Sequence, residues 1–101
     1  FNFFMAKGID GVISVAANII PSQISKICSL NLAKQFKEAE ELNLIFKDLY
    51  KLLFIESNPI PVKWMLSEMG KVQSGIRLPL VPFDENFHEK TRNEMLKLKL
   101  I

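Results

Sequence analysis

The sequence predicts an α/β fold that changes to an all-helical region further along the chain. A β-branched run, VISV at residues 12–15, follows Gly11 and is typical of a strand buried on both faces in a parallel sheet. Helical patterns lie on both sides of this run, which is the alternating order of α/β proteins. From about Gln35 onward, the apolar spacing is helical only.

The first part of the chain is expected to hold the end of one helix, the strand and a second helix. The stretch from Phe1 to Lys7 has the character of a helix end, and Gly8 closes it by supplying a left-handed conformation. Residues 16–20 are expected to form a loop. Pro21 begins the next helix, because proline costs little in a first turn whose N–H groups are unpaired. That helix runs to about residue 32, and its apolar face carries Ile24, Ile27 and Cys28.

The second part of the chain is predicted to contain helices only. Apolar residues recur at helical spacing from Phe36 to Leu53, so one broad stripe faces a partner surface. Prolines at residues 59 and 61 end that helix, because each disfavours helical geometry in the residue before it. A short helix over 62–69 ends at Gly70, and after a loop Asp84 caps a last helix over about 85–98.

Composition indicates an ordinary globular protein. The 101 residues are 49% hydrophobic and 24% charged, with a net charge of +2, which favours neither a nucleic-acid surface nor a basic membrane patch. No apolar run approaches the roughly 20 residues of a membrane helix, and we expect neither export nor a membrane span. The single cysteine fits a reducing cytoplasm. A start at Phe1, with three aromatic residues among the first four, suggests a cut inside a larger protein.

Spacing alone reveals no catalytic constellation. His88 has no cysteine or second histidine nearby, so a surface histidine is favoured over a metal ligand, and no metal is expected. Cys28 is favoured as a small hydrophobic residue over a nucleophile, since no histidine lies within local reach. A charged pattern typical of a solvated helix face contains Glu38, Glu40 and Glu41.

Lys63 beside Trp64 has two interpretations. A lysine desolvated against an aromatic surface can act as an amine nucleophile. The alternative is a lysine at a helix start whose stem is covered while its ammonium stays in water, and spacing favours this alternative. Met65 and Met69, one turn apart, are most simply core residues.

The order of several segments resembles a known enzyme family. GVISVAANI, then a long helix ending in LLFIESNPIPVKWMLSEMG, then IRLPLVPF and a closing helix, are together similar to the C-terminal third of bacterial dihydrodipicolinate synthases. The resemblance covers the whole chain, and it implies a TIM (β/α)8 barrel with appended C-terminal helices. Residues 1–34 would be the end of helix 7, strand 8 and helix 8 of the barrel. Residues 35–101 would be the C-terminal helical domain.

The resemblance also implies a reaction and its partners. Members of the family are lyases that condense pyruvate with L-aspartate 4-semialdehyde to 4-hydroxy-tetrahydrodipicolinate, in lysine biosynthesis by the diaminopimelate pathway, without a cofactor. A lysine forms a Schiff base with pyruvate, and the resulting enamine attacks the aldehyde. The family further implies a cytoplasmic homotetramer assembled as a dimer of dimers.

One site residue is implied within this sequence. The Schiff-base lysine and the other catalytic side chains belong to earlier strands of the family's barrel, so the chain alone is expected to be inactive and Lys63 is not expected to be the nucleophile. At the end of strand 8, a backbone carbonyl contributes to the pyruvate pocket, and GVIS places that carbonyl on Ile13. The alternative that Ile13 only packs the barrel interior stays open.

Two other functions stay open at this point. Related pyruvate-dependent aldolases such as N-acetylneuraminate lyase share the barrel and the Schiff-base chemistry, but they tend to differ around the eighth strand and the turn at residues 58–61. A non-catalytic helical interaction module would instead use the apolar stripe from Phe36 to Leu53 to bind a partner helix.

Overall fold

In the described part of the chain, all regular secondary structure is helical, and the chain forms two compact units. The computed structural model describes residues 4, 5 and 7–101. Unit 1 extends to Lys47 and unit 2 begins at Asp48. None of the helices in the described ranges has both the length and the apolar character needed to cross a membrane.

Unit 1 opens with a helical turn that ends at Gly8, as predicted. Gly8 has a φ of +105°, in the left-handed region that glycine adopts without strain. Its N–H donates to the carbonyl of Met5 at 3.0 Å, which closes the turn. The remainder of the predicted helix, at residues 1–3 and 6, lies outside the described residues.

The prediction of a strand at residues 12–15 is wrong for this structure. Residues 9–14 have no regular secondary structure, and a 3-10 helix, η1 (Val15–Asn18), begins where the strand was expected to end. The backbone N–H groups of residues 10–14 donate to none of the described residues. Strands exist through hydrogen bonds to a neighbouring strand, and local β-branched composition cannot supply that neighbour. The predicted loop at 16–20 is largely η1.

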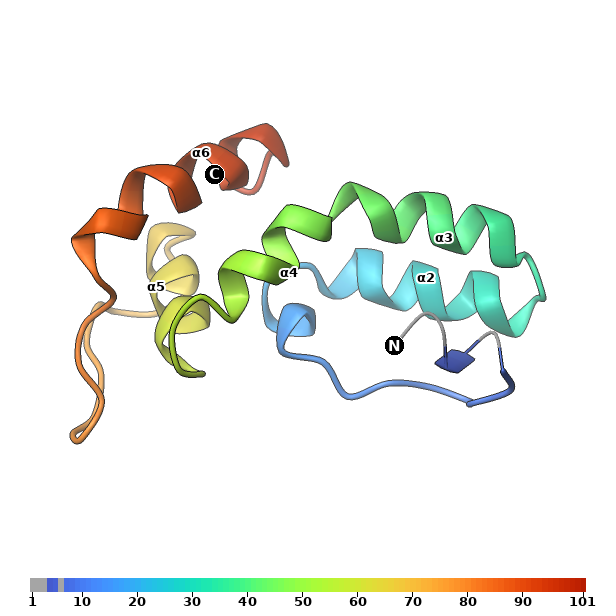
Figure 1. Ribbon diagram of the computed structural model, residues 1–101, viewed down its shortest axis with the longest axis horizontal. Coiled ribbons are helices and arrows are strands. Elements are labelled where there is room, and N and C mark those ends of the chain that lie inside the picture. Colours follow the sequence, from blue (N-terminus) through green and yellow to red (C-terminus); the bar gives the residue numbers. More distant parts are fainter. Residues whose placement is uncertain (1–3, 6) are drawn as a thin grey trace. The chain divides into compact units, whose positions relative to one another are not determined.

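Two helices pack side by side in unit 1 (Figure 1). They are α2 (Pro21–Leu32), which begins at the predicted proline, and α3 (Phe36–Ile45). Ile24 and Ile27 of α2 are buried, and so is Ala39 of α3. The apolar face predicted for the first of these helices is therefore confirmed at its two isoleucines.

The turn between α2 and α3 places Lys34 in a left-handed conformation, with a φ of +61°. The N–H of Gln35 donates to the carbonyl of Leu30 at 2.8 Å, the hydrogen bond that defines a Schellman motif. This conformation costs a lysine about 1–2 kcal/mol, whereas glycine adopts it without strain. The boundary expected between the barrel part and the helical domain, at residues 34 and 35, falls at this turn and therefore within unit 1. That division into domains stays a prediction.

The single helix predicted from Phe36 to Leu53 is divided at Phe46. Following α3, a second helix, α4 (Lys47–Leu53), begins after this residue. The N–H of Phe46 donates to the carbonyl of Asn43 at 3.1 Å, only three residues back, so the helical turn tightens there. Apolar spacing continues across the break because Phe46 itself is buried. This continuity is the reason that periodicity predicted one helix.

Unit 2 contains most of α4, then α5 (Ile60–Glu68), η2 (Glu85–Phe87) and α6 (His88–Lys97). The predicted helix end at Gly70 is confirmed, whereas Asp84 caps the 3-10 helix η2 and α6 begins only at His88. Gly70 follows α5 with a φ of +75°, and the Asp84 carboxylate accepts the backbone N–H two residues further on at 2.9 Å. Side chains that are fully buried in this unit include Leu49, Leu53, Pro61, Met65, Thr91 and Met95.

Candidate functional site

The residue expected to bind pyruvate, Ile13, lies in the irregular segment that precedes η1. Its side chain is fully exposed, so it packs no interior formed by the described residues. Ser14, which follows it, has extended backbone angles of φ −136° and ψ 135°. The Ile13 carbonyl accepts no hydrogen bond from the described residues. A contact between this carbonyl and pyruvate stays a prediction.

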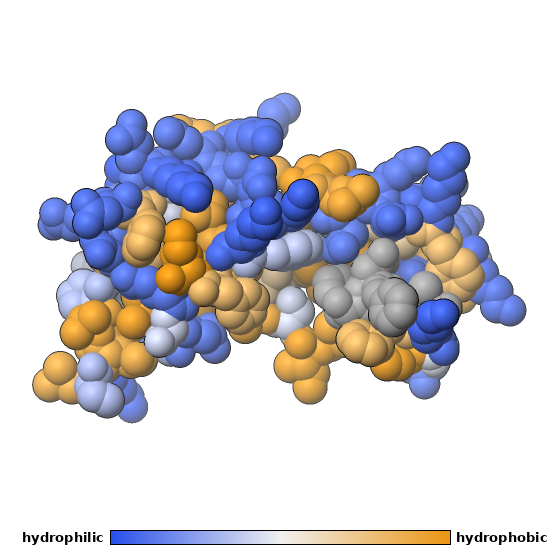
Figure 2. Space-filling view, in the orientation of Figure 1, coloured by the Kyte–Doolittle hydropathy of each residue, from blue (hydrophilic) through white to orange (hydrophobic). Residues whose placement is uncertain are grey.

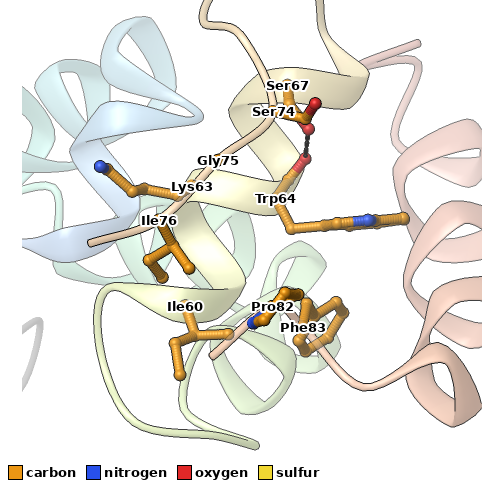
Figure 3. A pocket seen from close by; sticks show the side chains of 9 residues that line it. All are labelled: Ile60, Lys63, Trp64, Ser67, Ser74, Gly75, Ile76, Pro82 and Phe83. Atoms are coloured by element: carbon orange, nitrogen blue, oxygen red, sulfur yellow. Dashed lines mark hydrogen bonds between the residues drawn. The ribbon is translucent and has the colours of Figure 1, made fainter. Parts of the chain in front are cut away.

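Lys63 lines a pocket in unit 2 formed by α5 and the loop that follows it. The pocket has a volume of about 350 Å³. The Lys63 side chain is exposed and extends away from Trp64 (Figure 3). An ammonium in solvent is not desolvated against the indole ring, so the geometry favours a solvated lysine over an amine nucleophile.

His88 is half buried in an aromatic cluster, so it is less exposed than a typical surface histidine. Its ring stacks on that of Trp64 with centroids 4.6 Å apart, and it lies 5.6 Å from the ring of Phe83. Its Nε2 is 3.0 Å from the Phe83 carbonyl, and because a carbonyl only accepts, Nε2 donates in this contact. Within the described ranges, no group of three or more His, Cys, Asp or Glu side chains could hold a metal ion.

Arg92 adds a positive charge to the same cluster. Its guanidinium carbon lies 5.5 Å from the centre of the Trp64 ring, and its Nη2 is 3.1 Å from Glu68 Oε2. Both partners of this ion pair remain partly exposed, so its contribution to stability is small. His88 and Arg92 are one helical turn apart on α6, and this spacing is the sequence signal that would have indicated a shared contact.

Two groups with raised pKa values lie elsewhere in the fold. Desolvation by burial raises the pKa of the Cys28 thiol on α2, which keeps it in the neutral form and favours the predicted hydrophobic role. Desolvation also raises the pKa of Tyr50 on α4, to about 12. Cys28 belongs to unit 1, whereas the only histidine belongs to unit 2. The raised values fit packing better than nucleophilic or acid–base chemistry.

The remaining candidate side chains have structural environments close to those predicted. Glu38, Glu40 and Glu41 are exposed, which confirms a solvated face on α3. Figure 2 shows hydrophobic surface beside hydrophilic surface in this region, since Leu44 and Ile45 of α3 are also exposed. Met65 is fully buried in unit 2, and Met69 is half buried.

Comparison with known proteins relates the whole chain to one family. The sequence model of the Dihydrodipicolinate synthetase family matches residues 1–98. The 4-hydroxy-tetrahydrodipicolinate synthase of Teredinibacter turnerae is 44% identical over 93 residues, which are 92% of this chain and 32% of that protein. The synthase of Coxiella burnetii is 46% identical over 92 residues, 91% of this chain and 32% of that protein. The chain therefore spans about a third of the length of these curated relatives.

Solved structures give the same relationship. A chloride-inhibited dihydrodipicolinate synthase from Acinetobacter baumannii, complexed with pyruvate, superposes with a TM-score of 0.95 at 46% identity. That match covers 99% of this chain and 34% of the other. The enzyme from Thermotoga maritima also gives a TM-score of 0.95, at 37% identity over 99% of this chain and 34% of the other.

These matches define the class of protein: the chain is similar to one part of proteins named 4-hydroxy-tetrahydrodipicolinate synthase. The chain belongs to the Dihydrodipicolinate synthetase family. The resemblance inferred from its sequence segments is thereby confirmed. Which part of the barrel residues 1–34 form stays a prediction.

Proposed function

We propose that the chain is part of a 4-hydroxy-tetrahydrodipicolinate synthase, a lyase of lysine biosynthesis by the diaminopimelate pathway. The observation that carries the proposal is the family match over residues 1–98, at 44–46% identity to curated synthases. The whole enzyme would condense pyruvate with L-aspartate 4-semialdehyde. It would work in the cytoplasm as a homotetramer of two tight dimers.

The proposed chemistry begins at a lysine outside this chain. Its amine attacks the pyruvate ketone and releases water, which leaves a protonated imine. The imine withdraws electrons from the methyl carbon, so a base removes a proton there and an enamine forms. The enamine carbon then bonds to the aldehyde carbon of the second substrate. Lys63 takes no part in these steps, in agreement with its exposed ammonium.

The proposed contribution of this chain to the pocket is the backbone carbonyl of Ile13. Three observations support it. The carbonyl has no partner among the described residues, the next residue is extended, and the neighbouring N–H groups donate to none of the described residues. Such a segment is suited to pairing between two barrel strands. Barrel active sites collect at the C-terminal ends of strands, where Ile13 would then lie.

The test joins this chain to the part of the Acinetobacter baumannii relative that it does not cover. The chain alone and the chimera are each incubated with pyruvate and borohydride, and reduced adducts are located by mass spectrometry. We expect no adduct on the chain alone, and one adduct per chimera at a lysine outside these 101 residues. The chimera should also consume L-aspartate 4-semialdehyde. A chimera carrying Lys63→Met serves as the matched control and should form the same adduct.

Two results would contradict the proposal. Stoichiometric labelling of Lys63 in the chain alone would make it the nucleophile after all. A chimera that traps pyruvate and cleaves N-acetylneuraminate, yet leaves the semialdehyde unchanged, would assign the chain to the related aldolases instead.

A further inference from the structure

We propose that the pocket between α5 and the following loop binds a small carboxylate with an apolar body. The described residues that line the pocket belong to unit 2, whereas Ile13 belongs to unit 1, so this inference does not depend on the proposed function. Its volume of about 350 Å³ falls within the range of small-molecule sites, roughly 300–1,000 Å³.

One end of the pocket is apolar. Figure 3 shows Ile60, Ile76, Pro82 and Phe83 gathered there, and Ile60 and Phe83 are buried. Trp64 forms a side wall, and its ring is held by stacking against His88. A wall that is already fixed in place loses little entropy when a ligand binds, so an apolar ligand body is well suited to this end.

The other end of the pocket is polar. Ser67 and Ser74 both line the pocket there (Figure 3). The Ser67 hydroxyl donates to the Trp64 carbonyl at 2.7 Å, whereas the Ser74 hydroxyl makes no hydrogen bond to the described residues. The backbone N–H of Gly75, which also lines the pocket, likewise donates to none of them. Ser74 and Gly75 thus offer two donors to a ligand oxygen.

The positive charge of Lys63 at the pocket favours an anionic ligand. Among the described residues, Lys63 is the only charged one that lines it, and none of the lining residues is a carboxylate. The Lys63 side chain is exposed and forms no ion pair with the described residues, so no carboxylate among them competes with a bound anion for its ammonium. A cationic ligand would be repelled, and a neutral ligand would gain nothing from this charge.

Binding is measured on the full chain with 3-phenylpropanoate, followed through the fluorescence of Trp64, the only tryptophan. We expect saturation with a Kd on the order of a few millimolar, as for a ligand of about eleven heavy atoms. The neutral analogue 3-phenylpropanamide should bind about three- to fivefold more weakly. Lys63→Met should weaken carboxylate binding by the same factor and leave amide binding unchanged.

Lys71→Met is the matched control, because it removes an exposed lysine of the same unit that does not line the pocket. This variant should bind the carboxylate as the parent chain does. Equal affinities for carboxylate and amide would overturn the inference. So would a fluorescence change that never saturates, or equal losses in the Lys63→Met and Lys71→Met variants.

Discussion

The imidazole of His88 stacks on the indole of Trp64, with ring centroids 4.6 Å apart and planes inclined by 27°. This contact joins α6 to α5. Phe83 completes the cluster, since its ring lies 5.3 Å from that of Trp64 and its carbonyl accepts from His88 Nε2 at 3.0 Å. One side chain therefore connects two helices with the end of the loop between them.

Replacement of His88 by alanine should destabilise unit 2 by about 2 kcal/mol, from the loss of two ring contacts and one hydrogen bond. His88→Phe keeps the stacking and leaves the Phe83 carbonyl unpaired, so it should cost about half as much. Urea unfolding followed by Trp64 fluorescence measures both values.

Asn93→Ala is the control for this series, because Asn93 is exposed on the same helix. We expect its free energy of unfolding to stay within about 0.5 kcal/mol of the parent. If His88→Ala were equally neutral, the cluster would contribute nothing to the stability of unit 2.

Lys34→Gly should stabilise unit 1. Lys34 holds a φ of +61°, where a side chain costs about 1–2 kcal/mol, and the greater backbone entropy of glycine offsets roughly half of this gain. The expected net gain is about 0.5–1 kcal/mol, seen as slower amide hydrogen exchange in α2. Lys37→Gly, inside α3, is the matched control and should lose about 1 kcal/mol. A loss of protection in both variants would refute the assignment of strain to Lys34.

Tyr50 should make unit 2 less stable in alkali. Burial raises its pKa in the folded chain to about 12, against about 10 when unfolded, so folding favours the neutral phenol. The resulting stability is complete below pH 10 and is lost as the pH rises toward 12. Because Tyr50 is the only tyrosine, tyrosinate absorbance reports on it directly.

The titration of Tyr50 should have its midpoint near 12 in the native chain and near 10 in concentrated urea. In Tyr50→Phe, the urea midpoint should fall less steeply between pH 10 and 12 than in the parent chain. A native midpoint near 10 would show that the phenol is solvated.

Local signals explain which parts of the fold the sequence predicts. Gly8, Pro21, Gly70 and Asp84 each end or begin a helix where expected, because their effects act within one turn. The break at Phe46 was missed, since it preserves the apolar spacing on which the prediction relied. The prediction of a strand at 12–15 is wrong because a strand needs hydrogen bonds to a neighbouring strand, and that neighbour must come from a distant part of the sequence.

For the candidate site too, the sequence predicts features that depend on local signals and does not predict contacts between distant segments. Segment order was sufficient to indicate the family, which the family match confirms. The sequence does not predict the cluster around His88, because Trp64 lies on a different helix, far away in sequence. Phe83 is only five residues from His88 but belongs to the preceding loop, and no periodic pattern links a loop residue to a helix face. The exposed position of Lys63 agreed with prediction, because a lysine beside a helix start commonly keeps its ammonium in water.

The Ile13 carbonyl can be tested without changing any side chain. In the chimera, replacement of Ser14 by its α-hydroxy counterpart turns the amide between Ile13 and Ser14 into an ester, whose carbonyl is a weaker acceptor. The KM for pyruvate should rise about two- to tenfold, the value of one hydrogen bond. The matched control replaces Ile13 by its α-hydroxy counterpart, which removes one N–H and weakens the Val12 carbonyl instead, and its KM should stay near that of the parent. Equal KM values in the two ester variants would show that the Ile13 carbonyl does not contact pyruvate, since only the ester at Ser14 alters that carbonyl.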